Sequence, residues 1–173
     1  MKKWSSVELI RHYRHEWLNK LQIIHGNLQL NNTAEAERIV EQIIHATINE
    51  SNLTNTGMDR LTEYLLTFSW TTRVCLIDYE VIGEVREIKT LDDAIYTFVS
   101  SFVDTIEHNA DTSKEQWVAV TLELASDGVH CNLSFEGKLV DEAPLNRWLE
   151  NVNVGTYDKL ENDLIALEVT SRF

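Results

Sequence analysis

The sequence predicts an α+β protein: a long N-terminal helical hairpin, followed by a mainly antiparallel sheet with helices on one face. Three observations lead to this fold class. Apolar residues recur at helical spacing through the first third of the chain, a further helical stretch lies near residues 90–106, and an alternating pattern after it indicates a strand hairpin. We place the boundary at Thr56–Asp59, which gives domains at 1–56 and 57–173.

The first predicted helix covers residues 4–30 and carries one narrow apolar stripe. The stripe, which only Arg14 interrupts, consists of Ile10, Trp17, Leu21, Ile24 and Leu28. After a break at 31–33, a second helix follows and fades near residues 52–55. Its apolar face consists of Ile39, Val40, Ile43, Ile44 and Thr47. A connection this short makes the two helices antiparallel neighbours.

This hairpin has too little core of its own, so its apolar stripe must be covered by something else. Pairing two copies across a two-fold axis closes a four-helix bundle. We therefore predict a homodimer through residues 4–55. The alternative is a hairpin that folds back on the C-terminal domain of its own chain.

The pattern after the boundary is mixed. Residues 61–68 are predicted to be helical, and 74–81 and 85–88 extended. Thr90 is placed as the cap of a helix that carries Leu91, Ile95, Phe98, Phe102 and Ile106 on one face. Two alternating runs, 117–124 and 129–135, flank a turn signal at 126–128 and form a hairpin. A helix near 142–151 and a strand near 164–170 finish the chain.

The composition is that of an ordinary globular protein. The chain has 173 residues, of which 43% are hydrophobic and 25% charged. No apolar run approaches the ~18 residues that a membrane helix needs, and the N-terminus lacks the apolar region of a signal peptide. Cys75 and Cys131 are too few for a disulfide framework or a zinc cluster. We expect a reduced, cytoplasmic protein.

The net charge of −13 argues against general nucleic-acid binding. The charge is also uneven. The first 30 residues hold five basic and two acidic side chains, a formal charge of +3, so the remainder carries −16. A basic segment on an acidic body suggests a local site for an acidic partner, although a solvated helix face would have the same charge.

The first helix holds the residues that point to chemistry. His15 lies about 150° round the helix from the centre of the apolar stripe, and it therefore faces solvent rather than a bundle core. The polar, basic and small residues around it are Arg11, His12, Arg14, Asn19, Lys20, Gln22 and Gly26.

An exposed imidazole is largely neutral at cell pH and keeps a nucleophilic nitrogen that can attack a phosphoryl group. Arginine and lysine side chains nearby can balance phosphate charge, and Asn19 can orient the ring through hydrogen bonds. A small residue at Gly26 lets another surface approach closely. The spacing alone would also fit an ordinary surface histidine with polar neighbours.

A metal site on this helix finds less support. His12, His15 and Glu16 have the spacing of potential ligands, but the metalloprotease pattern H-E-x-x-H fails because residue 19 is Asn. No G-x-S-x-G motif indicates Ser/His/Asp catalysis. We expect no metal bound by this chain.

The run of residues 14–24, R-H-E-W-L-N-K-L-Q-I-I, followed by Gly26-Asn27-Leu28, closely resembles the phosphorylated helix of the sporulation initiation phosphotransferase B family. Residues 66–70 and 78–84 resemble the start of that family's second domain, and the order of elements agrees over essentially the whole chain. The core R-H-[DE]-x-x-N-K-L also occurs in some sensor histidine kinases, so the longer run carries the assignment.

The resemblance implies a homodimeric phosphorelay protein whose phosphoryl carrier is His15. Members of the family accept the phosphoryl group from the aspartate of a single-domain response regulator. They give it to the aspartate of a second regulator, a transcription factor. Mg²⁺ takes part, held in the acidic pocket of the regulator. We infer that the residues that bind the receiver domains are Arg11, His12, Arg14, Asn19, Lys20, Gln22 and Gly26.

The resemblance further implies an α/β sandwich domain similar to a histidine kinase ATP-binding domain without a working nucleotide site. The six glycines never form D-x-G-x-G or G-x-G-x-G, patterns that bring backbone close to phosphate. Residues 107–110, Glu-His-Asn-Ala, resemble a remnant of the magnesium-binding helix of active kinases, although an Asn near a helix end is also a common cap.

We therefore expect no ATP hydrolysis, no autophosphorylation and no tightly bound cofactor. Two alternatives remain open at this point. One is a kinase-like protein that still uses ATP, and the other is a non-catalytic dimeric scaffold for receiver domains.

Overall fold

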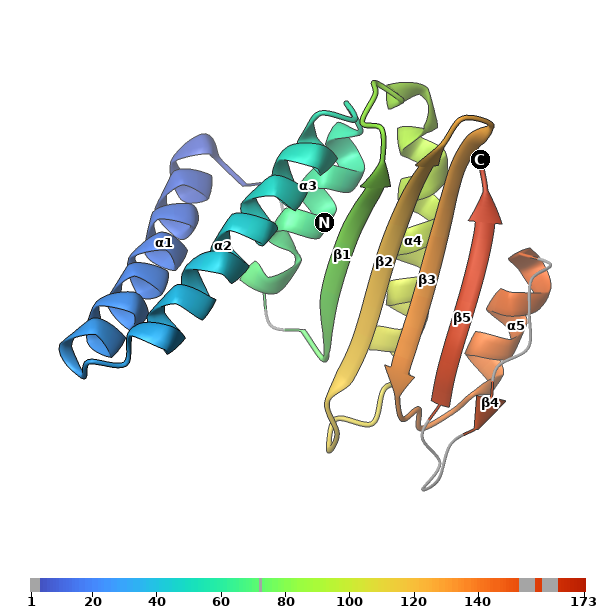
Figure 1. Ribbon diagram of the computed structural model, residues 1–173. Coiled ribbons are helices and arrows are strands. Elements are labelled where there is room, and N and C mark those ends of the chain that lie inside the picture. The colour runs from blue at the N-terminus through green and yellow to red at the C-terminus, as the bar shows by residue number, and fades with distance from the viewer. Residues whose placement is uncertain (1–3, 72, 153–157, 160–164) are drawn as a thin grey trace. The chain divides into compact units, whose positions relative to one another are not determined.

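The computed structural model describes residues 4–71, 73–152, 158–159 and 165–173 (Figure 1). The contacts within the chain form two compact units, Met1–Ser51 and Asn52–Phe173, so the division falls inside the second helix. In the described ranges, no helix is long and apolar enough to cross a membrane.

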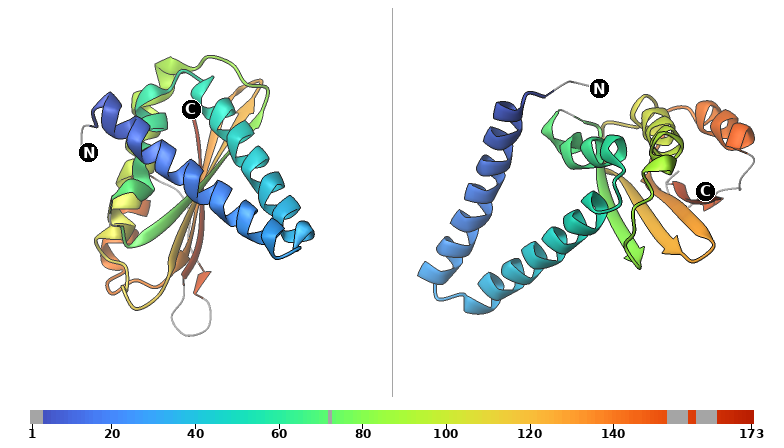
Figure 2. Two further views of the ribbon diagram at one scale, coloured as in Figure 1. Left: turned by 90° about the vertical axis from the view of Figure 1, so that its left-hand side faces the viewer. Right: turned by 90° about the horizontal axis from the view of Figure 1, so that it is seen from above.

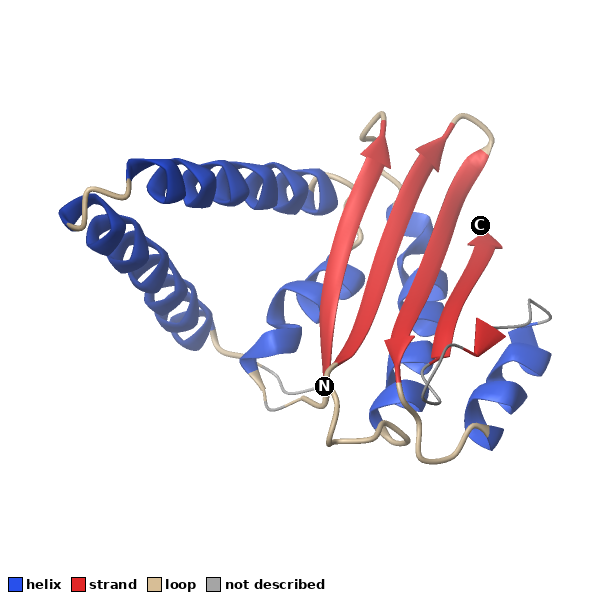
Figure 3. Cartoon of the chain, turned by 60° about the horizontal axis from the view of Figure 1, so that its bottom comes forward, coloured by secondary structure: helices blue, strands red, loops and turns tan. Residues whose placement is uncertain are grey.

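The first unit contains the predicted hairpin. Helix α1 covers Ser6–Gln29 and α2 covers Thr33–Thr54, joined by the short turn that Figure 3 shows. Ser5 and Glu8 form a capping box at the start of α1, in which each side chain bonds the backbone N–H of the other. Asn31 turns the chain with a φ of 56°, a conformation that asparagine tolerates better than most residues.

The second unit is a five-stranded sheet with helices. Its strands are β1 (Cys75–Gly83), β2 (Gln116–Ala125), β3 (Gly128–Gly137), β4 (Asp158–Lys159) and β5 (Ile165–Arg172). Its helices are α3 (Asp59–Thr67), α4 (Asp92–Glu107) and α5 (Ala143–Val152), with short 3₁₀ turns at Phe68–Trp70 and Lys89–Leu91. The strand order is β1-β2-β3-β5-β4, and every described pair is antiparallel except β1 with β2. The predicted α+β class is confirmed.

Helices α4 and α5 cover one face of this sheet (Figures 1 and 2). The strand residues alternate accordingly. On β2, Val118, Val120 and Leu122 face the helices and are buried, whereas Trp117 and Glu123 on the other face are exposed. The core of this unit therefore lies between the sheet and its helices, and the opposite sheet face is open.

Two local predictions for this unit are wrong. Residues 85–88 do not form a strand, and Thr90 does not cap the helix, because a 3₁₀ turn precedes α4 and the helix begins at Asp92. The Asp92 carboxylate instead accepts hydrogen bonds from the backbone N–H groups of Arg60 and Leu61, both at 2.9 Å. One helix thus caps the start of another that lies about 30 residues earlier. Residue 164, where the last strand was expected to begin, lies outside the described residues.

A buried glutamine holds the end of β3 against the loop that follows α4. Gln116 has no solvent exposure. Its amide nitrogen donates to the carbonyl oxygens of Asp111 at 2.7 Å and Lys114 at 3.2 Å, and its amide oxygen accepts from the backbone N–H of Lys138 at 2.9 Å. A Cβ at Gly137 would collide with that amide oxygen and with the ring of Phe135, so glycine leaves the space that Gln116 fills.

We predict that Gln116→Ala lowers the free energy of unfolding by about 2 kcal/mol, because the change leaves buried backbone groups without partners. Urea unfolding followed by circular dichroism measures the effect. Gln29→Ala, at an exposed position near the end of α1, is the matched control and should change stability by less than ~0.5 kcal/mol. Equal unfolding midpoints for the two variants would contradict this account of the loop.

Candidate functional site

The structure places His15 near the middle of α1 with its side chain exposed. The half-buried residues of the same helix include Trp17 and Ile24, which lie on the side away from His15 at 100° per residue. The backbone here is a capped, uninterrupted helix, so the histidine is presented by a stiff element rather than by a loop.

Asn19 lies one turn after His15 and contacts it directly. The amide nitrogen Nδ2 of Asn19 is 3.3 Å from the ring nitrogen Nδ1 of His15. An asparagine amide can present its nitrogen or its oxygen to a neighbour, so it can donate a hydrogen bond to a bare Nδ1 or accept one from Nδ1–H. Nε2 of His15 has no hydrogen-bond partner among the described residues and is open to a reacting group.

The other predicted site residues divide into two groups. Arg11, Arg14 and Gln22 are exposed. His12 and Lys20 are half-buried and lie against aromatic rings: the His12 ring meets Trp4 edge-on at 4.8 Å between centroids, and Lys20 Nζ is 5.8 Å from the centre of the Trp17 ring. Asn19 therefore makes a direct contact with His15. Arg11, His12 and Gln22 lie on nearly the same side of the helix, and Arg14 and Lys20 lie further round it.

Gly26 lies about three turns beyond His15. A Cβ built on it would have no atom within 4 Å, so the chain's own packing does not require glycine there. This open space is compatible with close approach of another molecule, which remains a prediction.

The aromatic neighbours were missed by sequence reasoning. The i, i+3 spacing of Trp17 and Lys20 could have indicated their contact. Trp4 precedes the helix cap, and no simple spacing rule places its ring on His12. A hydrogen bond from the Tyr13 hydroxyl to the Glu50 carboxylate, at 3.2 Å, also ties α1 to α2 within this unit.

Both hairpin helices keep apolar side chains exposed. On α1, Ile10 is 65% exposed, and on α2, Ile48 is 54% exposed. Leu21, Leu28, Val40 and Ile44 are exposed as well. Near the turn, a groove of about 390 Å³ is lined by Ile24, Leu28, Thr33, Ala36, Glu37, Val40 and Glu41. This surface is unusual for a helix pair that functions alone.

No group of three or more His, Cys, Asp or Glu side chains in the described part of the chain could hold a metal ion. The segment that resembles a kinase magnesium helix makes structural bonds. The Glu107 carboxylate accepts from the backbone N–H groups of Val74 and Cys75, both at 2.8 Å, and lies 3.5 Å from Arg73. The Asn109 amide donates to the carbonyl oxygen of Thr105 at 2.7 Å, as a helix cap would.

The same segment is held to the end of β3. The backbone N–H of Val140 donates to the Asn109 carbonyl oxygen at 2.7 Å, and Ala110 forms a β-bridge with Leu139. Burial and the hydrogen bond to Glu107 raise the pKa of the Cys75 thiol, which therefore stays protonated at neutral pH. These residues connect α4, β1 and the β3 end within the core.

Two family models match this chain one after the other. The model for the "Sensor kinase SpoOB-type, alpha-helical domain" matches residues 1–56, and the model for "Sporulation initiation phospho-transferase B, C-terminal" matches residues 57–168. The chain therefore belongs to the sporulation initiation phosphotransferase B family.

A curated relative and a solved structure were also found. Sporulation initiation phosphotransferase B of Bacillus subtilis (strain 168) is 26% identical over 167 residues, which cover 95% of this chain and 84% of the relative. The histidine kinase AdeS of Acinetobacter baumannii has 10% sequence identity and a TM-score of 0.40, with 91% of this chain and 97% of that chain covered. The assignment depends on the family models and the curated relative.

Proposed function

We propose that this protein is a phosphorelay phosphotransferase in which His15 carries the phosphoryl group. It accepts the group from the aspartyl-phosphate of a single-domain response regulator and passes it to the aspartate of a second regulator, a transcription factor that controls sporulation. The observation that carries the proposal is the exposed His15, with Nδ1 held by Asn19, in a member of this phosphotransferase family.

The chemistry needs little from the chain beyond the ring and its orientation. A neutral imidazole nitrogen attacks phosphorus, an N–P bond forms, and the P–O bond to the donor aspartate breaks with release of the carboxylate. The proton stays on the other ring nitrogen. Attack by the second aspartate reverses the sequence. A rigid helix supports such a transfer by limiting the motion of the nucleophile.

Partner recognition is proposed for the surface around His15. Arg11 and Arg14 are exposed near the histidine and suit an acidic receiver pocket, with Asn19, Gln22 and Gly26 along the same helix. His12 and Lys20 belong to the same proposed surface. We expect Mg²⁺ to be bound by the regulator and not by this chain. In the regulator, it would screen the negative charge of the phosphoryl group during transfer.

A homodimer is proposed through the hairpin. The contact region would consist of the exposed apolar residues of α1 and α2 and the groove near their turn. A second hairpin would bury these residues in a four-helix bundle. Leu21 and Ile44 lie on these faces. His15 lies on another side of α1 and would stay accessible after pairing.

We also propose that this protein carries out no ATP chemistry. Glu107 and Asn109, the residues that resemble a magnesium-binding remnant, are bonded to backbone groups of the core. Such bonds would have to break before either side chain could hold a metal-bound nucleotide. The second unit is therefore proposed to position the hairpin and contact a partner rather than to bind ATP.

We predict that His15→Ala abolishes phosphoryl transfer from a phosphorylated single-domain response regulator, because the carrier nitrogen is removed. Because the side chain is exposed, the unfolding free energy should change by less than ~0.5 kcal/mol, and the dimer should persist. Labelled phosphate on the wild type, stable to base and labile to acid, measures the reaction, and ATP alone serves as a separate donor.

The possible results of this experiment distinguish a phosphoryl carrier from a scaffold and from a protein that uses ATP. Label on the wild type but not on His15→Ala, with none from ATP, supports the carrier role. Regulator binding without label on the protein would favour a scaffold. Label from ATP alone would contradict the proposal that the second unit lacks nucleotide chemistry.

We predict that Asn19→Ala slows phosphoryl uptake by about tenfold, because the loss of one hydrogen bond to Nδ1 removes the preference for one ring orientation. Single-turnover transfer and a parallel regulator-binding titration measure the two effects separately. Gln22→Ala, on the same face but not bonded to His15, is the control. A fall in regulator affinity that accounts for the whole rate loss would assign Asn19 to binding instead.

We predict that Leu21→Glu converts the dimer to a monomer, because it places a charge in the apolar contact that pairs the hairpins. Sedimentation equilibrium measures the mass. Gln22→Glu, one residue along but on the His15 face, is the matched control and should leave the dimer intact. A monomeric wild type, or an intact Leu21→Glu dimer, would refute the proposed contact region.

A further inference from the structure

The helix-free face of the sheet carries a row of side chains that the core does not use. The register pairs Leu76 of β1 with Trp117 of β2, and Trp117 with Glu136 of β3. All three side chains lie on the face opposite the helices. Trp117 is 43% exposed and Leu76 is 47% exposed.

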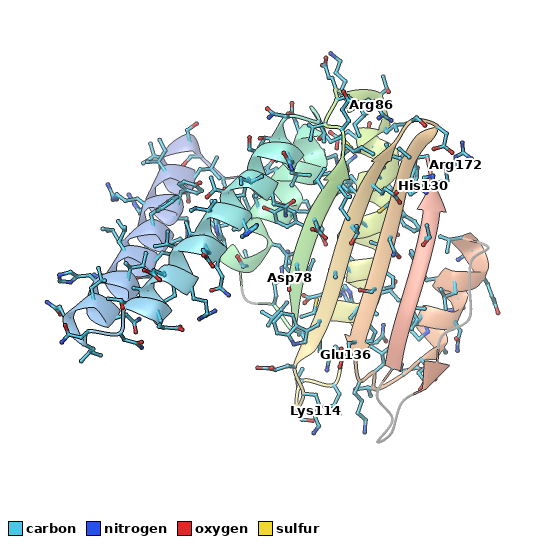
Figure 4. All side chains as sticks on the ribbon, viewed as in Figure 1. Asp78, Arg86, Lys114, His130, Glu136 and Arg172 are labelled. Carbon is cyan, nitrogen blue, oxygen red and sulfur yellow. The ribbon has the colours of Figure 1, made fainter. Side chains whose placement is uncertain are left out.

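Two further carboxylates follow on the same face of β1, at Asp78 and Glu80, because successive side chains on one face of a strand are two residues apart. We define the acidic–aromatic patch as Leu76, Asp78, Glu80, Trp117 and Glu136. Figure 4 labels Asp78 and Glu136 toward the same end of the strands. Beside the patch, the same face of the sheet continues with the small side chains of Ala119 and Ser134, which project little above the strands.

Within the described part of the chain, no cation forms an ion pair with the carboxylates of the patch. Asp78, Glu80 and Glu136 have no hydrogen bond or ion pair with any residue that the structure describes, and no cation lies over the Trp117 ring there. Of the lysines nearest in sequence, Lys114 and Lys138 contribute by their charge to lowering the pKa of Asp111, after the larger effect of the hydrogen bonds from Ser113.

The other end of the same face is different. There the Asp127 carboxylate is 2.9 Å from Arg172 Nη2, and the Glu123 carboxylate is 3.9 Å from His130 Nδ1. Figure 4 labels His130 and Arg172 at this end. Arg172 therefore supplies a positive charge to a carboxylate at one end of this face, whereas at the other end no described residue forms an ion pair with the patch.

We propose that the acidic–aromatic patch docks an extended, arginine-bearing segment of a basic protein partner. A guanidinium stacks on an indole ring while its N–H groups bond neighbouring carboxylates, a combination that suits arginine better than lysine. Asp78 and Glu80 repeat every two residues, the period at which one side of an extended segment presents its own side chains. Tryptophan and arginine are also the residues that most often anchor protein contacts.

The test uses the full-length protein and a short synthetic peptide in which arginine and valine alternate. The protein has five tryptophans, so nuclear magnetic resonance follows five indole N–H signals, and Trp117→Phe assigns one of them. We expect the Trp117 signal to shift saturably with peptide while the other four stay in place. A peptide with lysine for arginine should bind about threefold more weakly.

A matched pair of triple variants separates the patch from general charge attraction. Asp78→Asn with Glu80→Gln and Glu136→Gln should weaken binding of the arginine peptide by about tenfold, as three exposed ion pairs of ordinary strength would. Glu63→Gln with Glu84→Gln and Glu150→Gln removes the same charge from exposed positions outside the patch and should change affinity by less than about twofold. All six side chains are exposed, so both variants should fold.

Four results would overturn the proposal. Three of them are equal losses in the two triple variants, no saturable shift of the Trp117 signal, and equal affinity for the lysine peptide. A Trp117 signal that moves with protein concentration, without any peptide, would instead identify a second copy of this chain as the occupant and would also overturn it.

Discussion

A helix pair can bury only one side of each helix, and much of this protein follows from that limit. Helix α1 has α2 as its partner within the first unit: the Tyr13 hydroxyl donates to the Glu50 carboxylate, and Ile24 lines a groove together with residues of α2 near the turn. Ile10 and Leu21, which share the apolar stripe of α1 with Ile24, stay exposed, and His15 lies on the opposite side of the helix. The apolar side needs a further surface to cover it, and the polar side is free to react.

The proposed chemistry depends on short-range order within α1. The capping box of Ser5 and Glu8 fixes the start of the helix, and the next turns then set His15 and Asn19 four residues apart on one face. A histidine held in this way needs no pocket of its own. Metal and acidic groups are expected to come from the partner, which agrees with a helix surface where arginine is exposed.

In the second unit, several polar side chains form hydrogen bonds that join its helices, strands and loops. Glu107 joins the end of α4 to the start of β1, Gln116 joins a loop to the end of β3, and Asp92 caps α3. These bonds occupy side chains that in another setting would suggest a catalytic role. The open sheet face is the exception, because the acidic–aromatic patch takes no part in these bonds.

Helix and strand periods are local properties, so the hairpin, the main strands, the helices and the exposed position of His15 could all be predicted from the sequence. The prediction failed at Thr90, where capping was decided by Asp92 and its contact with another helix. The parallel pairing of β1 with β2, the burial of Gln116 and the ring of Trp4 against His12 were decided only by the tertiary structure. Each of these joins groups that local periodicity cannot relate, since their contact depends on how whole elements pack.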